Sequence, residues 1–485
     1  MRIARAITAL GVVAVVAGSQ LAAAGDWTRF GYEAARRNAA PSTGGITAAN
    51  LGQLRRRQVH LDGTVDSSPI YLAAVRMGRA RHDVFVVTTT YGKTLAIDAR
   101  SGRILWRYVP AAYARLAGTF QITTATPVAD PGRAYVYSAS PDGVVHKLAV
   151  ANGREVTSGG WPVTVTLDPH YEKVGSALNF SRGLVLVTTG GYIGDTPPYQ
   201  GHVVAIRAKT GAIVSVFNSL CSDRHELIAP SSCSASDSAI WARSGAVVDP
   251  ETGNLLVATG NGPWNGSTNW GDSVLELTPD ASQLLQNWTP VDQKQLEGSD
   301  TDLGSTAPAL LGNGLVLQSG KDAKMRLLDL HRLNGRTHSA GPITGGELQT
   351  LPAPGGGSVY TAPAVWRSAG ATWVFVATFN GTGAYKLVGR RIVKVWENGT
   401  GGTSPVVAGG LLFVYGGGLR IYRPDSPRPI ATLATGTGHW NSPIVADGRI
   451  ALPEGDANDH RTDGVLDIWS LPDSRGQAAT IGSRA

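Results

Sequence analysis

The chain has 485 residues, of which 61 are glycine, and only 16% of its residues are charged. Length alone suggests about three domains, but long amphipathic helical faces are missing, which favours many short strands joined by turns. The net charge of +7 is modest, its one dense basic run is 55–57, and no nucleic-acid-binding motif is present, so nucleic acid is not an expected partner.

The N-terminus has the three parts of a secretory signal peptide. Arg2 and Arg5 give a positive start, residues 6–18 are apolar, and the alanines at 22–24 offer a cleavage site. A membrane anchor, the alternative, needs about 18 or more apolar residues, and this run is shorter. We therefore expect residues 1–24 to be a signal peptide cleaved near Ala24, giving a periplasmic or extracellular protein with no membrane span.

After an extended N-terminal lead-in at 25–63, in which ITAANLGQL could form one helical turn, the region 64–485 is repetitive. A small or hydroxyl-bearing pair, often followed by proline, opens an apolar run at intervals of roughly 50 residues. Eight such openings occur, at 67–70, 125–128, 176–178, 244–247, 306–309, 361–364, 403–406 and 441–444.

Within each unit a second apolar run follows, and a third often leads into a turn of the form A-x-D-x-x-x-G. The most complete copy is AIDARSGRILW. In it, Asp98 can cap the turn and Gly102 supplies a positive φ. Trp106 starts the last strand and is expected to pack between units.

Units of three or four strands cannot bury both faces alone, but eight of them arranged radially can. A β-solenoid is the alternative, but its coils are much shorter than these units. We therefore predict an all-β fold: an eight-bladed β-propeller of four-stranded antiparallel blades with tryptophan-docking turns. Ring closure would require the segment near 55–70 or the C-terminal LDIWSLP to complete a shared blade.

The two cysteines of the chain are Cys221 and Cys233, in one long polar stretch. In an exported protein the simplest expectation is a disulfide that pins this loop. A metal site would need more ligands, and His225 is the only histidine nearby. The sequence also lacks CxxCH, so no covalently attached c-type haem is expected.

Between WARSG and LLDL, polar side chains that could bind a ligand or take part in catalysis lie beside short apolar runs. Asn261 follows LLVATG, Asp300 and Asp302 precede an apolar run, and Lys321 follows LQSG. Side chains at strand ends and adjoining loops are where a rigid sheet positions binding and catalytic groups. The structural alternatives are a turn for Asn261, a solvated acidic loop for Asp302, and a surface ion pair for Lys321.

Other polar and aromatic residues are expected to be structural. Asp272, in WGDSVLEL, is expected to cap a strand start, and His439, in GTGHWNSP, to be hydrogen-bonded rather than catalytic. The tryptophans at 264, 270 and 288 are expected to pack within blades. The sequence has no GxSxG, HExxH, P-loop or dinucleotide-binding glycine motif.

These motifs carry a family resemblance. AIDARSGRILW resembles the tryptophan-docking turn of the quinoprotein propellers, whose cofactor is pyrroloquinoline quinone (PQQ). The lead-in WTRFGYEAARRNAAP…ITAANLGQL is similar to the N-terminal segment of PQQ-repeat proteins. GAVVDPETGNLLVATGNGPWN, continued through DTDLGS to SGKDAKMRLLDL, resembles the active-site blades of PQQ-dependent alcohol dehydrogenases.

The resemblance implies roles for particular residues. Asn261 matches a calcium-coordinating asparagine, Asp302 matches the aspartate that contacts calcium and serves as base, and Lys321 matches a basic residue that hydrogen-bonds the quinone oxygens. In such a site a hard cation polarises the quinone carbonyl and a carboxylate takes the alcohol proton. A fixed cation stabilises the charge that develops on the quinone oxygen.

The sequence departs from the family pattern at three points. The nearest match to the family's calcium-binding glutamate is Asp195, which is therefore a candidate metal ligand. The tryptophan that stacks beneath the quinone falls at about Arg243, with Trp241 two residues away, so both are candidate cofactor contacts. The disulfide between adjacent cysteines that many members have is absent.

We expect an exported quinoprotein-like propeller that acts as a PQQ- and calcium-dependent dehydrogenase of an alcohol or polyol. Because the sequence has no haem motif, such an enzyme needs a separate electron acceptor. The alternative is a non-catalytic PQQ-like propeller that acts as a binding or assembly scaffold for a protein partner in the cell envelope. A hydrolase or lyase built on the same propeller is the third option.

Overall fold

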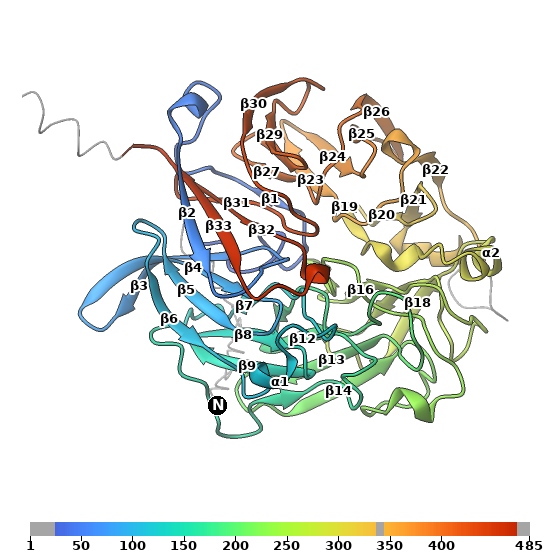
Figure 1. Ribbon diagram of the computed structural model, residues 1–485. Helices are drawn as coiled ribbons and strands as arrows, with labels where there is room; N and C mark the ends of the chain where they lie inside the picture. Colours follow the sequence, from blue (N-terminus) through green and yellow to red (C-terminus); the bar gives the residue numbers. More distant parts are fainter. Residues whose placement is uncertain (1–24, 336–343, 473–485) are drawn as a thin grey trace, which may run out of the picture.

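Eight antiparallel sheets follow one another in chain order in the computed structural model, which describes residues 25–335 and 344–472 (Figure 1). The expected signal peptide lies outside the described residues. The first strand of each sheet begins within or directly after one of the eight predicted openings. The predicted eight-bladed β-propeller of four-stranded blades is confirmed.

Seven of the eight sheets are formed mainly by four strands that are consecutive in the chain. The first four sheets are β3 (Ile70–Met77), β4 (Ala80–Thr88), β5 (Thr94–Asp98) and β6 (Ile104–Tyr108); β7 (Val128–Ala129), β8 (Tyr135–Ser140), β9 (Val144–Ala149) and β10 (Val163–Thr164); β11 (Asn179–Ser181), β12 (Leu184–Thr188), β13 (His202–Arg207) and β14 (Ile213–Asn218); and β15 (Val247–Val248), β16 (Leu255–Ala258), β17 (Val274–Leu277) and β18 (Leu284–Trp288).

The remaining sheets are β19 (Ala309–Gly312), β20 (Leu315–Ser319), β21 (Lys324–Asp329) and β22 (Gln349–Pro352); β23 (Ala364–Ser368), β24 (Ala371–Ala377), β25 (Thr382–Val388) and β26 (Arg391–Asn398); β27 (Val406–Ala408), β28 (Leu411–Tyr415), β29 (Leu419–Tyr422) and β30 (Pro429–Leu433), with β1 (Ala39–Ala40) added beside β27; and β31 (Ile444–Ala446), β32 (Arg449–Glu454), β33 (Gly464–Ser470) and β2 (Arg55–Leu61).

The first strand of each sheet lies toward the axis of the ring. In the seventh sheet, β27 is buried throughout, whereas the fourth strand, β30, is exposed or half-buried along its length. First strands of neighbouring sheets contact each other, as β11 does with β7 and β23 with β19 and β27. Residues next to the first strands therefore face the centre of the ring.

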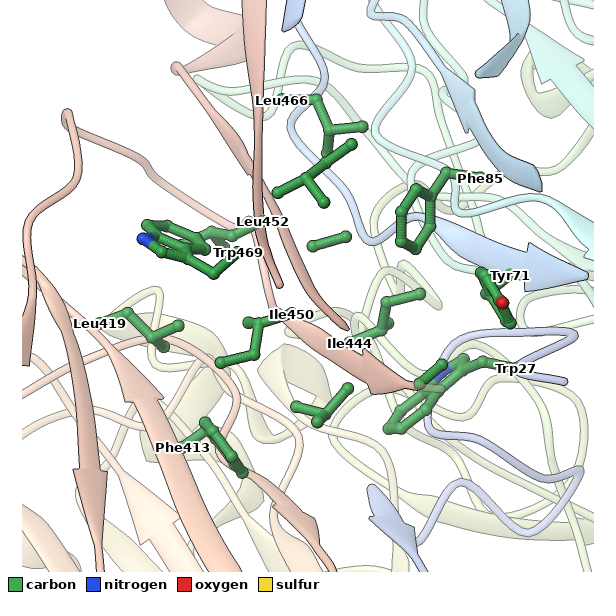
Figure 2. Close-up of a cluster of buried hydrophobic side chains, with 14 of the residues drawn as sticks. Trp27, Tyr71, Phe85, Phe413, Leu419, Ile444, Ile450, Leu452, Leu466 and Trp469 are labelled. Atoms are coloured by element: carbon green, nitrogen blue, oxygen red, sulfur yellow. The ribbon is translucent and has the colours of Figure 1, made fainter. Parts of the chain in front are cut away.

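Strand β2, from the segment expected as the lead-in, closes the ring. It pairs antiparallel with β33 over its whole length, so the eighth sheet combines the N-terminal and C-terminal parts of the chain (Figure 1). Figure 2 shows the core beside this closure, where Phe85, Tyr71 and Trp27 lie on one side of the closing strands and Trp469 and Leu419 on the other. Burying such large apolar side chains contributes roughly 1.5–3 kcal/mol each.

The rest of the lead-in runs across the first strands. Its backbone hydrogen-bonds the first strands of five sheets, through the pairs Trp27 with Tyr71, Thr28 with Ala129, Ala34 with Val248, Arg37 with Val365, and Asn38 with Val407. These contacts lie along the strands, downstream of their starts. The lead-in therefore covers the side of the ring toward which the first strands run.

The tryptophan-docking turn forms as the sequence predicts. Asp98 Oδ1 accepts hydrogen bonds from the Ser101 backbone N–H and hydroxyl, both at 2.7 Å, and Gly102 has φ +75°. Trp106 donates from Nε1 to the Val150 carbonyl of the next sheet at 2.9 Å. A Cβ at Gly153 would lie 2.5 Å from the Trp106 ring, so the indole packs directly on the glycine backbone.

Helices are short and lie in the loops, as α1 (Tyr113–Leu116) and α2 (Gln293–Gly298) do. Within the described part of the chain, no helix is long and apolar enough to cross a bilayer.

Candidate functional site

A cavity of about 610 Å³ lies on the side of the ring from which the first strands start. Its lining comes from two equivalent places in the repeat. Residues just before first strands include Thr124, Lys173, Trp241, Arg243, Asp302, Tyr360 and Trp440, and residues after second strands include Asp195, Asn261 and Lys321. Six sheets, the second to the sixth and the eighth, thus deliver loop residues to one central site, although these residues are far apart in sequence.

Asp302, Asn261 and Lys321 form one bonded group in this cavity. Asp302 is only 4% exposed, and its Oδ1 accepts a hydrogen bond of 2.7 Å from the Asn261 backbone N–H. Its Oδ2 is ion-paired with Lys321 Nζ. A Cβ at Gly260 would lie 2.2 Å from Asp302 Oδ1, so only glycine leaves room for the carboxylate there. The structure brings the three predicted residues together.

Lys321 is held by two carboxylates and an indole. Its Nζ lies 2.8 Å from Asp300 Oδ1 and 5.7 Å from the centre of the Trp241 ring. Burial lowers the pKa of Lys321, but Asp302 and then Asp300 outweigh this effect and raise it above its ordinary value. Lys321 is therefore a fixed cation beside the acidic wall of the cavity, which is formed by Asp195, Asp237, Asp300 and Asp302.

Asp195 reaches the same wall from a loop after β12. Its side chain is exposed at the rim of the cavity, and its Oδ1 accepts a 3.1 Å hydrogen bond from the Tyr199 hydroxyl. Loss of surrounding water, and then the charge of Asp302, raise the pKa of Asp195. Burial likewise raises the pKa of Asp237, which lines the same wall.

The disulfide predicted between Cys221 and Cys233 is present, with a Cα–Cα distance of 6.1 Å. It pins the loop that follows β14, and the chain then continues to Asp237. The bridge therefore restrains a loop whose end lines the cavity.

Trp241 and Arg243 lie at different depths of the cavity. Trp241 lines the cavity beside Tyr360, with ring centres 6.2 Å apart. Arg243 is 5% exposed and lies at the floor, where its guanidinium donates to the carbonyls of Asp66 at 3.0 Å, Thr124 at 3.2 Å and Gly175 at 3.3 Å. Burial lowers the pKa of Arg243 to about 10.

Two expectations about structural residues need more detail. Asp272 lies just before β17, but it does more than cap a strand, because its Oδ1 accepts from the Leu303 backbone N–H at 3.0 Å. It thereby anchors η3 (Leu303–Ser305), which follows Asp302. The tryptophans at 264, 270 and 288 pack against sheet residues, as predicted, and do not line the cavity.

Sequence reasoning missed several residues of the lining. Lys173, Tyr360 and Trp440 occupy the position before a first strand that Trp241 and Asp302 also occupy. Tyr360 contacts Trp241 and Trp440, so an aromatic wall spans several sheets. Aligning the eight units on their openings would have placed these three residues beside the predicted ones.

Comparison with known proteins supports the same assignment of fold. A PQQ-repeat family model, described as outer membrane protein assembly factor BamB, matches residues 72–217. The dehydrogenase subunit of alcohol dehydrogenase (quinone) from Acetobacter aceti is 26% identical over 248 residues, covering 43% of this chain and 32% of that protein. Quinohemoprotein alcohol dehydrogenase ADH IIB from Pseudomonas putida is 25% identical over 371 residues, covering 68% and 49%.

This chain thus spans only about a third to a half of the length of these curated relatives. Solved structures share the fold. Quinohemoprotein alcohol dehydrogenase from Comamonas testosteroni has a TM-score of 0.65 at 17% identity, covering 92% of this chain and 80% of that one. BamB from Moraxella catarrhalis has a TM-score of 0.53 at 14% identity, covering 87% and 98%.

A europium-containing methanol dehydrogenase also has a TM-score of 0.65, at 16% identity, and covers 92% of this chain and 98% of that one. The comparisons confirm the resemblance that the sequence predicts, to the PQQ-repeat β-propellers of the quinoprotein alcohol dehydrogenase-like superfamily.

Proposed function

We propose that this chain is an exported, PQQ- and calcium-dependent dehydrogenase that oxidises an alcohol or polyol. The observation that carries the proposal is the placement of Asp302. A buried carboxylate, held by the Asn261 backbone N–H and by Lys321, faces a central cavity of about 610 Å³. Cavities of a few hundred Å³ or more with few convergent polar groups are typical of small-molecule sites.

The acidic wall of the cavity fits a divalent cation. Asp195, Asp237, Asp300 and Asp302 line it, and Lys321 is the one cation on this wall among the described residues. Burial, and after it the charge of Asp302, raises the pKa of Asp195 and Asp237, and a bound cation would favour their ionised forms. Asp302, Asn261 and Asp195 offer the oxygen ligands that Ca²⁺ prefers.

The rest of the lining fits a flat aromatic acid such as PQQ. The rings of Trp241, Tyr360 and Trp440 offer apolar faces, and Lys173 and Arg243 lie at the floor as cations for acidic groups. PQQ bound there would supply a two-electron acceptor, and Ca²⁺ would make it more electrophilic. The predicted roles of Trp241 and Arg243 as cofactor contacts are part of this proposal.

The protein's own chemistry would centre on Asp302. Its carboxylate is held in place by Lys321 and by the Asn261 N–H, where it would accept the proton of a substrate hydroxyl as hydride leaves the adjacent carbon. Trp241 and Tyr360 would restrict how a substrate approaches. Lys321 would hold Asp302 in place and donate to an oxygen of the bound cofactor.

Export and a separate electron carrier belong to the same proposal. The disulfide supports an oxidising compartment, periplasmic or extracellular. Because the sequence has no CxxCH motif, electrons would pass to another protein or a small carrier.

A second candidate is a non-catalytic scaffold in the cell envelope. It is supported by the family model described as an assembly factor and by the likeness to BamB of Moraxella catarrhalis. A scaffold would not need a carboxylate and an ammonium paired in a central cavity, and so the first candidate is favoured.

The test is oxidation of an alcohol panel by the mature protein, loaded with PQQ and Ca²⁺ and coupled to an artificial dye. Asp302→Asn should lower turnover by about 10²-fold or more, because the asparagine cannot accept the proton. Asp459→Asn, at an exposed carboxylate near the cavity, is the matched control and should leave turnover unchanged. Equal turnover in Asp302→Asn and the wild-type protein would contradict the proposed role.

A further inference from the structure

His439 lines the same cavity as Asp302 but lies at its other end. From Lys321, a row of rings leads across through Trp241, Tyr360 and Trp440, and His439 packs on Trp440 with ring centres 4.3 Å apart. His439 precedes β31 in the eighth sheet, whereas Asp302 precedes β19 in the fifth. The two groups therefore lie at opposite ends of this row of rings.

Two carboxylates hold the imidazole through Nδ1. The Nδ1 atom lies 2.8 Å from Asp66 Oδ2 and 3.2 Å from Asp456 Oδ1. Asp66 is fully buried, and its oxygens also accept from the backbone N–H groups of Trp440 at 2.6 Å and Ala457 at 3.1 Å. Burial alone would raise the pKa of Asp66, but His439 and then Arg243 keep it below its ordinary value.

These contacts determine which ring nitrogen carries the proton. Asp66 is an ionised acceptor and cannot donate, so Nδ1 must be the protonated nitrogen of neutral His439. Its Nε2 is then a free lone pair, and within the described residues no hydrogen bond to Nε2 occurs. The arrangement of a buried carboxylate, an oriented imidazole and an open Nε2 is that of a general base.

His439 also connects the cavity with solvent. It lines a second, more open cavity of about 490 Å³ between the sixth, seventh and eighth sheets. The Asp456 side chain is 35% exposed, whereas that of Asp66 is wholly buried. One carboxylate therefore orients the ring, and the other can pass a proton to water.

The surrounding charges also act on His439. Lys173, Asp66, Asp456 and Arg243 interact electrostatically at this end of the cavity, and the Arg243 guanidinium lies 5.9 Å from the centre of the Trp440 ring. Burial lowers the pKa of Lys173 to about 8. Two carboxylates and two cations thus meet at the end of the cavity where His439 lies.

We propose that His439 is the proton exit of the cavity, oriented by Asp66 and discharged through Asp456. The inference rests on the proposed dehydrogenase function. Oxidation of an alcohol to a carbonyl gives two electrons, which go to the carrier, and two protons. Asp302 takes the hydroxyl proton and loses it to water when the product leaves. His439 takes the second proton at Nε2 as the electrons pass to the carrier, and then loses its Nδ1 proton to Asp456 and water. It regains its starting tautomer when water of the second cavity takes the Nε2 proton and Asp456 returns one to Nδ1.

The first test needs no ligand. NMR measures the ¹⁵N chemical shifts of the histidine rings in the apo protein. The His439 signal is assigned through its loss in His439→Gln, and its shifts should show a neutral ring with the proton on Nδ1. In Asp66→Asn the amide can donate to Nδ1, and the proton should move to Nε2. A wild-type His439 with the proton on Nε2 would overturn the proposal.

The second test separates proton exit from alcohol oxidation. It uses the full chain with PQQ, Ca²⁺ and an alcohol of the panel that the protein oxidises. His439→Gln should leave the first turnover without electron carrier unchanged but lower steady-state turnover by about 10-fold or more, and added imidazole should restore part of it. Asp456→Asn should show a smaller loss, and Asp459→Asn none.

Equal steady-state turnover in His439→Gln and wild-type protein would overturn the proton exit alone. A wild-type protein that binds PQQ but completes no first turnover would instead overturn the proposed function, and the relay with it. Stoichiometric Zn²⁺ binding that His439→Gln abolishes would make the imidazole a metal ligand and would also contradict the relay.

Discussion

At the scale of single residues, two carboxylates beside the cavity show how surroundings decide chemistry. Asp302 has a cation on one oxygen and a backbone N–H on the other. Asp272 is fully buried with one N–H donor, from Leu303, and its Oδ2 has no hydrogen-bond partner. Burial, followed by the charges of Asp302 and other acids, raises the pKa of Asp272 to about 8. Asp302 is paired with a cation, whereas Asp272 is a neutral anchor below about pH 8.

The state of Asp272 predicts a dependence of stability on pH. Because its pKa is higher in the folded chain than the ordinary 3.8, the folded state binds more protons between pH 3.8 and about 8. The contribution of Asp272 to stability is therefore present at low pH and is lost as pH rises through this window. Asp272→Asn should flatten this slope and raise the free energy of unfolding at pH 7 by about 2 kcal/mol.

Urea unfolding of wild-type and Asp272→Asn protein at pH 5 and pH 7 checks this prediction. The difference between the two proteins should grow with pH. A difference that stays constant or reverses would show that Asp272 is ionised in the folded state.

At the scale of elements, three docking tryptophans each join one sheet to the next. Trp106 of β6 packs on Gly153 of the following sheet, and Trp161 and Trp396 donate in the same way to the carbonyls of Ala208 and Pro424. Each indole buries a large apolar surface and satisfies its one donor. The turn is therefore a joint that fixes the spacing of neighbouring blades, and through it the spacing of the cavity loops.

Gly153→Ala tests this joint. Its Cβ would lie 2.5 Å from the Trp106 ring, at a φ of +70°. Gly78→Ala is the matched control, because it has a φ of +61° with nothing within 4 Å of the added Cβ. Both changes carry backbone strain, so the clash should make Gly153→Ala more destabilising by about 2 kcal/mol. Equal urea-unfolding midpoints for the two variants would mean that the indole does not dock as described.

Turns and strand starts are the features that the sequence predicted best, because they depend on residues close together in the chain. Asp98 and Gly102 predict their turn from residues only four apart. The eight openings predict where the first strands begin. Asn261, Asp302 and Lys321 could also be found, because each lies beside an apolar run. His439 was expected only to be hydrogen-bonded. Its partners Asp66 and Asp456 come from opposite ends of the chain and meet only when the ring closes.

At the scale of the whole molecule, ring closure creates the site. Strands β2 and β33 join the ends of the repeat region. Arg56 of β2 bonds the buried Asp467 of β33 at 2.8 and 2.6 Å. The lead-in covers one side of the ring, which leaves the cavity on the other. The acidic wall and the cationic floor of that cavity each combine loops of more than one sheet, so the site is a property of the closed ring.

The measurement that tests the central claim most directly is equilibrium binding of PQQ to the mature protein, followed by quenching of tryptophan fluorescence, with Ca²⁺ and with EGTA. We predict saturable 1:1 binding with Ca²⁺ that weakens at least 10-fold with EGTA and in Asp302→Ala and Asn261→Ala, while Asp459→Asn binds like wild type. No binding at tens of micromolar PQQ, or binding that none of these changes alters, would contradict a quinoprotein site and favour the scaffold.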